Sequence, residues 1–305
     1  MRRAALIFNP KSGRQTAQRL WPKLEKILRA GGFDVEPLPT AGPGDATRLA
    51  RAMVEAGDRE VVFALGGDGT LREVAAGLMG SEVALGPIPG GTANVLTLAL
   101  DIPRRPLAAA AALAGGSVRR MDVGAAGDTP FLMMVSGGLD AVIMARQSSE
   151  MKRRFGALAV AVSGFLHWWR YTYPDIELRI DQEPIQVTFF SASNIRQYGG
   201  PFRLAPEADY ADGMLDVVLF RGRGRWAVSS LAWDIFLGRH HRRRDLEIRK
   251  VRALEIRGPL PDGLQVDGDV LQVGLPVGLE VRASALCVLT PKPCRRAVES
   301  PEGAA

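Results

Sequence analysis

The stretch ALGGDGTLREV, Ala64–Val74, decides the fold of this chain. It links the apolar run EVVFAL, Glu60–Leu65, to a segment with helical periodicity through three glycines, an aspartate and a threonine. Thr70 and Glu73 have the Thr-x-x-Glu spacing of a capping box, which predicts that a helix starts here. A buried strand, a glycine turn and a helix in this order indicate one unit of an open α/β sheet.

The same alternation continues on both sides of this unit. We predict strands at 4–8, 33–38, 60–65 and 83–88, and helices at 15–30, 45–56 and 71–79. Strands that alternate with helices favour a doubly wound, mainly parallel sheet in the N-terminal part of the chain.

Three polar, glycine-containing loops follow strands of this sheet, at 9–13, 66–70 and 89–94. The carboxyl ends of parallel strands are where open α/β sheets bind ligands. Glycines let a phosphate approach the backbone, and a helix N-terminus offers free N–H groups. The carboxylate of Asp68 repels phosphate unless it acts through Mg²⁺, a hydroxyl or a positive group. The chain has neither GxxxxGK[ST] nor GxGxxG after its first strand, which excludes a P-loop and argues against a dehydrogenase.

The pattern changes near Met121, where strands begin to follow one another without intervening helices. Turn pairs such as Gly127-Asp128, Asp181-Gln182 and Asp267-Gly268 punctuate them. This predicts an antiparallel, sandwich-like β domain, interrupted by helices at 152–173 and 226–237.

The composition favours a cytoplasmic protein without a membrane-spanning segment. The chain has 305 residues, of which 47% are hydrophobic, and no apolar stretch approaches the roughly 18 residues that a membrane span needs. The first apolar run ends at Phe8, too early for a signal peptide. With only two cysteines, a cytoplasmic protein with reduced thiols is the default expectation. The net charge of +6 attracts nucleic acid, anionic membranes or phosphorylated substrates.

Six motifs carry a resemblance that covers residues 4 to 290. NPKSG, GGDGTLREV and PGGTANVL, followed by NIRQYGG, RLAPEADYADGMLDVVLF and LQVDGDVL, resemble the diacylglycerol kinase catalytic-domain family. That superfamily includes sphingosine kinases, bacterial lipid kinases and, more distantly, NAD kinases.

The resemblance implies a two-domain enzyme with ATP and Mg²⁺ in the cleft. The nucleotide-binding domain is expected at 1–122, with a last strand at about 284–293 returning to it, and a β-rich lipid-substrate domain at 123–283. The residues implied for nucleotide binding are Asn9, Pro10, Lys11, Ser12, Gly13, Thr40, Gly66, Gly67, Asp68, Gly69, Thr70, Glu73, Gly91, Thr92 and Asn94.

Asp267 matches the family's general base by the same resemblance. The family usually has Asp-Gly-Glu, whereas this chain has Asp267-Gly268-Asp269, which puts the role of Asp269 in doubt. Read from the residues alone, the two carboxylates lie on one side of an extended segment and share or divide base and metal roles, or the tripeptide is only a β-turn. Asp209, Asp212 and the Met214 carbonyl match a structural Mg²⁺ site of some bacterial members.

The predicted function is ATP-dependent phosphorylation of a lipid hydroxyl, with an NAD kinase or a non-catalytic lipid- or nucleotide-binding regulator as alternatives. The predicted partners are ATP and a lipid at a membrane surface, without nucleic acid, and a homodimer is left open. Basic and aromatic residues at 152–173, including Trp168 and Trp169, and a basic patch with Arg242–Arg244 favour peripheral membrane association.

Overall fold

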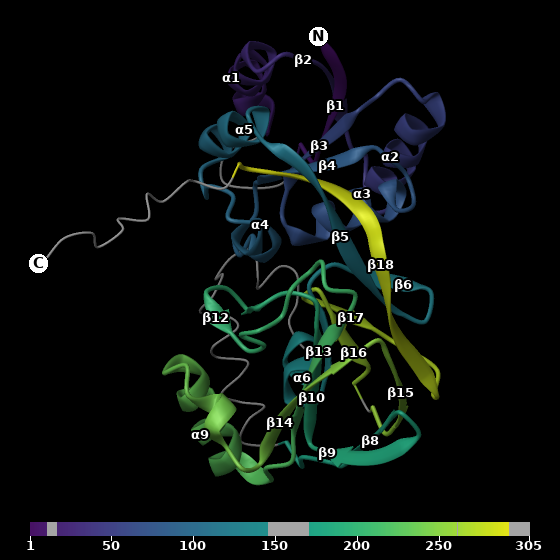
Figure 1. The fold of residues 1–305 in the computed structure, drawn as a ribbon, viewed down its shortest axis with the longest axis vertical. Helices are drawn as coiled ribbons and strands as arrows, with labels where there is room; N and C mark the ends of the chain where they lie inside the picture. The colour runs from purple at the N-terminus through teal and green to yellow at the C-terminus, as the bar shows by residue number, and fades with distance from the viewer. Residues whose placement is uncertain (11–16, 146–170, 261, 293–305) are drawn as a thin grey trace, which may run out of the picture.

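The computed structural model describes residues 1–10, 17–145, 171–260 and 262–292. Figure 1 shows two halves, one above the other, and two long strands that run through both, β5 (Ser117–Ala126) and β18 (Val277–Thr290). Lys11, Ser12 and Gly13 of the first predicted loop lie outside the described residues, as does most of the helix predicted at 152–173. The last three residues of that segment, 171–173, are described and are not helical.

The N-terminal half is an α/β unit. Its elements are β1 (Arg2–Phe8), α1 (Ala17–Ala30), β2 (Phe33–Pro39), α2 (Asp45–Ala56), β3 (Val61–Gly66), α3 (Asp68–Leu78), β4 (Ala84–Pro89), α4 (Val95–Ala99) and α5 (Pro106–Ala114). Four parallel strands form the order β2-β1-β3-β4. β3 and β4 are buried along their whole length, as expected where helices cover both faces of a parallel sheet. The predicted doubly wound sheet is confirmed.

The start of α3 differs from the prediction. The helix begins at Asp68, three residues before the predicted Leu71, and no side chain of the described residues caps it. Thr70 therefore lies in the first turn, and the Glu73 carboxylate accepts a hydrogen bond from the Gly44 N–H at 3.1 Å. The predicted capping box is wrong, because Glu73 is used to hold the loop before α2.

The C-terminal half is a β-sandwich. Its elements are β6 (Thr129–Phe131), β7 (Met134–Gly137), α6 (Leu139–Ala145), β8 (Ile176–Ile180), β9 (Glu183–Val187), β10 (Phe189–Ser193), β11 (Gln197–Tyr198), β12 (Phe202–Arg203), β13 (Leu215–Phe220), α9 (Gly224–Phe236), the 3-10 helix η1 (His240–Arg242), β14 (Leu246–Val251), β15 (Ala253–Gly258), β16 (Leu264–Val266) and β17 (Asp269–Leu271). An antiparallel sheet in the order β14-β13-β10-β7-β16-β17 faces the strands β18-β15-β8-β9. Phe190 and Val217 of one sheet and Leu178 and Ile256 of the other share one buried core. The predicted antiparallel sandwich is confirmed.

β5 and β18 connect the two halves. They pair antiparallel from Ser117–Thr290 at the upper end to Ala126–Leu279 at the lower end, with a register shift between Arg282 and Leu286. The upper ends of both strands belong to the N-terminal core, and the lower ends belong to the sandwich core. β18 also pairs in parallel with β4. Two continuous strands therefore fix how the halves face each other.

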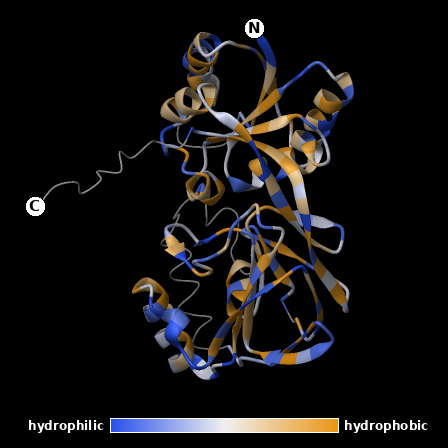
Figure 2. Ribbon diagram, viewed as in Figure 1, coloured by the Kyte–Doolittle hydropathy of each residue, from blue (hydrophilic) through white to orange (hydrophobic). Residues whose placement is uncertain are grey.

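A third apolar cluster lies on the outer face of the sandwich. α9 contributes Leu231, which packs with Val218, Phe220 and Leu246 of β13 and β14. Figure 2 shows hydrophobic and hydrophilic residues mixed along α9. None of the helices that the structure describes is long and apolar enough to cross a bilayer.

Candidate active site

The glycines of the loop after β3 lie in close contact with the glycines of the loop after β4. The Gly90 N–H donates to the Gly66 carbonyl at 2.7 Å. A Cβ added to Gly91 would lie 2.6 Å from the Gly67 Cα. Because the neighbour is backbone rather than a flexible side chain, no residue with a Cβ fits there without moving the loop. The loops after β3 and β4 thus form one surface of bare backbone.

Asp68 has a structural partner that the sequence does not reveal. Its Oδ1 atom accepts a hydrogen bond from the Leu96 N–H at 3.1 Å, at the start of α4. Burial raises the pKa of Asp68, although hydrogen bonds from the backbone around Asn94–Leu96 oppose that rise. The carboxylate therefore ties the GGDGT loop to the loop that precedes α4. Asn94 closes that second loop, since its side chain accepts from the Gly91 N–H at 2.8 Å and donates to the Gly91 carbonyl at 2.9 Å.

A cavity of about 310 Å³, lined by both polar and apolar residues, opens beside these loops. Its lining includes four of the predicted nucleotide residues, two from the loops after β1 and β2 and two from the first turns of α3: Asn9, Thr40, Thr70 and Glu73. Ala41, Gly42 and Pro43 complete the wall between β2 and α2. The tertiary structure therefore brings together residues that lie up to 64 positions apart, from 9 to 73.

The residues around this cavity suit the phosphates of a nucleotide. α3 has its N-terminus at the glycine loop, and the positive end of a helix dipole favours an anion. Thr92 is exposed on the neighbouring loop, and Pro10 is half-buried beside Asn9. The donors are hydroxyls, an amide and backbone N–H groups, which fit phosphate oxygens.

The Asp267-Gly268-Asp269 tripeptide forms a tight turn between β16 and β17, the second of the two conformations that the sequence left open. Asp267 and Gly268 have φ values of 49° and 89°, so the two carboxylates point to different environments. Asp267 is buried, with 7% of its surface exposed. Its carboxylate accepts hydrogen bonds from three consecutive backbone N–H groups, those of Leu132 (2.8 Å), Met133 (2.9 Å) and Met134 (3.0 Å). Burial raises its pKa to about 6 against the effect of these donors.

Asp269 lies at the junction of the two halves. Its side chain is 59% exposed and forms an ion pair with Arg72 of α3, Nη2 to Oδ2, at 2.7 Å. Arg72 also donates to the Val266 carbonyl at 3.1 Å. A Cβ built on Gly69 would lie 3.9 Å from the Asp269 carboxylate. The DGD turn is thus held directly against the GGDGT loop, and Arg72 is a site residue that sequence reasoning missed although it lies inside the motif.

A second cavity, of about 240 Å³, is almost wholly apolar. It lies between α6, the sheet and α9, and its lining includes Leu139, Ile143, Phe189, Phe220, Val228, Leu231 and Ile235. The sequence gives no signal for it, because its walls are ordinary core residues from five elements.

One polar network borders the apolar cavity. The Asp140 carboxylate accepts hydrogen bonds from the hydroxyls of Ser136 and, at 3.1 Å, Tyr198. Ser136 also contacts the Gln265 side chain at 2.9 Å. Burial raises the pKa of both Asp140 and Tyr198. Asp140 is the sole acid in the apolar stretch MVSGGLDAVIM, and that contrast is the signal that could have identified it.

The predicted metal residues lie far from the DGD turn in the sequence, on the loop before β13. There the Asp212 carboxylate is paired with the Lys250 ammonium at 2.7 Å, a partner that the sequence did not indicate. His240, in η1, is 1% exposed, with its Nε2 atom 2.9 Å from the Leu204 carbonyl oxygen.

Family models match both halves of the chain. Residues 3–126 match the diacylglycerol kinase catalytic domain, and residues 133–290 match the YegS C-terminal NAD kinase beta sandwich-like domain. "Diacylglycerol kinase" of Bacillus subtilis (strain 168) is 28% identical over 276 residues, which cover 88% of this chain and 90% of that protein. "Probable lipid kinase YegS-like" of Chromohalobacter salexigens is 36% identical over 222 residues, 71% of this chain and 70% of that protein.

The fold agrees with these matches. The crystal structure of a diacylglycerol kinase from Bacillus anthracis str. Sterne superposes with a TM-score of 0.79 at 21% sequence identity, covering 95% of this chain and 97% of that chain. With both halves matched in order and the glycine loops facing the DGD turn, the chain belongs to the diacylglycerol kinase and YegS-like family of lipid kinases.

Proposed function

We propose that this protein transfers the γ-phosphate of ATP to a hydroxyl group of a lipid, with diacylglycerol as the expected acceptor. One observation carries the proposal: Arg72 joins the glycine loop of one half to Asp269 of the other, with an ion pair of 2.7 Å. The loop suits a phosphate, and the exposed carboxylate suits the acceptor's proton. Curated relatives named diacylglycerol kinase support the choice of acceptor.

Phosphoryl transfer depends on positioning and on neutralising charge. In the proposed site, the backbone of Gly66–Gly69 and Gly91, with Asn9, Thr40 and Thr70, holds the nucleotide. Mg²⁺ bound to the phosphates would supply the remaining positive charge. The resemblance also implied Lys11 to Gly13 for this task, and they stay a prediction because they lie outside the described residues.

In this proposal the two carboxylates of the DGD turn have different roles. Asp269 accepts the proton of the lipid hydroxyl while the new oxygen–phosphorus bond forms and the bond to the leaving oxygen of ADP breaks. Its ion pair with Arg72 uses Oδ2, so Oδ1 takes the proton. Asp267 positions the turn, because all three of its hydrogen bonds hold the backbone of residues 132–134. This moves the general base from Asp267, to which the resemblance assigned it, to Asp269, whose role the resemblance left in doubt.

The apolar cavity is the proposed site for an acyl chain. Its walls come from the sandwich half, and its polar border at Asp140 and Tyr198 suits the ester or hydroxyl groups near the head of a glyceride. A nucleoside acceptor such as NAD has no long apolar part to fill such a cavity, so the cavity favours a lipid.

A phosphate-transfer assay tests the proposal. With labelled ATP and Mg²⁺, we expect label in diacylglycerol presented in mixed micelles, and none in NAD. Sphingosine, ceramide and phosphatidylglycerol are parallel arms. Val228→Trp, which narrows the apolar cavity, is expected to raise KM for the lipid about tenfold and to leave KM for ATP unchanged. Label in NAD alone would indicate the NAD kinase alternative, and ATP binding without any transfer would indicate the regulator.

The lipid is proposed to be reached at an anionic membrane surface through α9. One face of this helix lines the apolar cavity through Val228, Leu231 and Ile235. The opposite side exposes three large aromatic side chains, Trp226 (76%), Trp233 (61%) and Phe236 (62%). Trp233 and Phe236 stack at 5.5 Å between ring centroids, and the exposed Phe202 lies 6.4 Å from Phe236. A continuous exposed aromatic surface of this kind marks an interaction site.

The charged side chains around this aromatic surface favour an anionic membrane as the partner. Arg239, Arg242 and Arg244 are exposed directly after α9 and form no ion pair among the residues that the structure describes. Arg243, which the sequence grouped with them, is instead paired with Asp234 and Asp245. Aromatic side chains beside free arginines suit the interface of an anionic bilayer. Trp168 and Trp169, proposed from the sequence for the same role, lie outside the described residues.

Vesicle binding tests this surface. Sedimentation with phosphatidylglycerol vesicles is expected to exceed that with phosphatidylcholine vesicles, and added salt should release the protein. The double variant Trp233→Ala/Phe236→Ala is expected to bind about tenfold or more weakly, since burying each ring is worth about 1 to 2 kcal/mol. Val118→Ala, at an exposed valine of the other half, is the matched control. Unchanged binding of the double variant would contradict the role of α9.

A further inference from the structure

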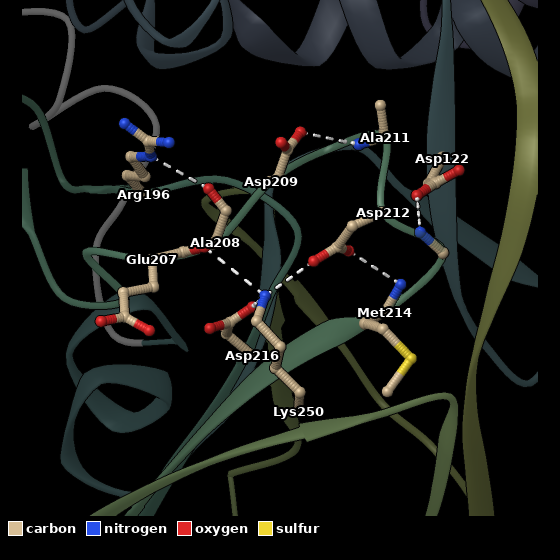
Figure 3. Close-up of polar contacts among 11 residues, drawn as sticks. Asp122, Arg196, Glu207, Ala208, Asp209, Ala211, Asp212, Met214, Asp216 and Lys250 are labelled. Atoms are coloured by element: carbon tan, nitrogen blue, oxygen red, sulfur yellow. Dashed lines mark hydrogen bonds and ion pairs between the residues drawn. The ribbon is translucent and has the colours of Figure 1, made fainter.

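The segment from Glu207 to Asp216, called here the acidic loop, contacts the side chain of Lys250 (Figure 3). The Lys250 Nζ atom lies 2.7 Å from Asp212 Oδ2 and 2.9 Å from Asp216 Oδ2. It also contacts the Glu207 carbonyl oxygen at 3.5 Å. An ammonium has three N–H donors, and each of them has a partner in the loop.

The sheet fixes this lysine in place. β13 and β14 pair antiparallel, and Asp216 and Lys250 are direct cross-strand partners. Their side chains therefore start side by side. Asp216 is 2% exposed, and its burial raises its pKa while the ion pair with Lys250 opposes that rise. A buried carboxylate in this position needs a cation close by.

Two further carboxylate oxygens of the acidic loop accept hydrogen bonds from its own backbone. The second oxygen of Asp212 accepts from the Met214 N–H at 3.0 Å, and Asp209 accepts from the Ala211 N–H at 3.1 Å. Asp122 of β5 holds the same loop from the other side, accepting from the Gly213 N–H at 2.6 Å. The loop conformation is thus satisfied by groups of the chain itself.

The resemblance implied a structural Mg²⁺ held by Asp209, Asp212 and the Met214 carbonyl, and the residues present do not fit one. Mg²⁺ demands about six oxygen ligands at about 2.0–2.1 Å in octahedral geometry. Both Asp212 oxygens already have hydrogen-bond donors, and one donor is a cation whose charge would repel a second cation.

We propose that the Lys250 ammonium is the built-in cation of the acidic loop, so that the loop keeps its fold without a divalent metal ion. The lysine replaces the mobile charge of a metal with one that is covalently attached and already placed by the β13–β14 pairing. Burial lowers the pKa of Lys250, but its two carboxylate partners outweigh that effect and the net shift is upward. The ammonium therefore stays charged throughout the neutral range.

Thermal unfolding tests the proposal. The Tm of the wild-type protein without nucleotide is expected to be the same in EDTA and in millimolar Mg²⁺, because no ligand that binds only the native loop is removed. Lys250→Met, which keeps most of the length of the side chain and removes its charge, is expected to lower Tm by about 5 °C or more. Lys250→Arg, which keeps the charge, should retain most of the stability.

Two results would overturn the proposal. One is a rise in wild-type Tm with Mg²⁺ that Asp212→Asn removes, because it would show a divalent ion bound at the loop. The other is a Lys250→Met protein with unchanged Tm. The wild-type titration gives an answer even if Lys250→Met fails to fold.

Discussion

Asp269→Asn is expected to lower kcat by about 10²- to 10⁴-fold, the usual effect of removing a general base. The amide keeps the size of the side chain and an oxygen for Arg72, which lies 2.7 Å away, but it cannot take the proton of the lipid hydroxyl. Because the side chain is largely exposed, Tm and nucleotide binding should change little. The measurement is turnover with the lipid identified in the panel, together with ATP binding and thermal unfolding on the same preparation.

A matched control separates base loss from ion-pair loss. Asp58 forms an ion pair with Arg3 of the same length, 2.7 Å, remote from the glycine loops. Asp58→Asn should keep full activity. Near-normal turnover of Asp269→Asn would remove Asp269 from the proposed chemistry, and a loss of ATP binding would make it a nucleotide or metal contact instead.

Asp267→Asn is the contrasting variant, because Asp267 is proposed to position the turn. Its amide nitrogen would face a backbone N–H of residues 132–134, which costs about 1 to 3 kcal/mol for a donor left unsatisfied. We therefore expect a lower Tm. A full loss of turnover with unchanged Tm would restore Asp267 as the base, as the sequence resemblance implied.

The pH dependence of stability gives a second readout for Asp267. Its pKa in the folded protein is about 6, above the ordinary value of 3.8, so the folded state holds this proton more tightly than the unfolded state. Its contribution to the unfolding free energy is therefore highest at low pH and falls as pH rises from about 4 to about 6. Asp267→Asn should remove that part of the slope. The same slope in wild type and variant would contradict a raised pKa.

Gly91→Ala is expected to weaken ATP binding by about 10- to 100-fold. The new Cβ would lie 2.6 Å from the Gly67 Cα, so the loops after β3 and β4 must separate. Forcing an added methyl into a filled site costs about 1 to 3 kcal/mol, and each 1.4 kcal/mol is about tenfold in affinity. The surface that the glycines share is the proposed phosphate site, so the strain falls on nucleotide binding. Calorimetry or a fluorescent ATP analogue measures it.

Gly115→Ala is the control for this substitution. Gly115 ends α5 with a φ of −94°, and a Cβ there meets no atom within 4 Å. That variant should bind ATP normally. Normal ATP binding by Gly91→Ala would mean that the two loops do not form the phosphate site.

The sequence by itself determined the first seven elements, β1 to β4 with α1 to α3, and their order. Apolar runs of five or six residues between helical segments predicted β3 and β4, and the structure buries both completely. Glycines after these strands predicted loops with bare backbone, because few other residues allow such close approach. The predicted change to an antiparallel sandwich near Met121 falls within β5, the strand that enters both halves. These features depend on residues that are close together in the sequence, so local sequence patterns are enough to predict them.

Only the tertiary structure decided how the charged side chains are used. Asp267 and Asp269 are two residues apart, yet a left-handed turn buries one against the backbone of residues 132–134 and leaves the other beside Arg72, 197 positions away. Asp68 accepts a hydrogen bond from the Leu96 amide of α4, and Lys250 pairs with Asp212, which the resemblance implied as a metal ligand. The partner of each charge is brought by folding from a distant segment, and the free energy of burying a charge depends on that partner. Sequence patterns record local periodicity and do not contain these long-range contacts.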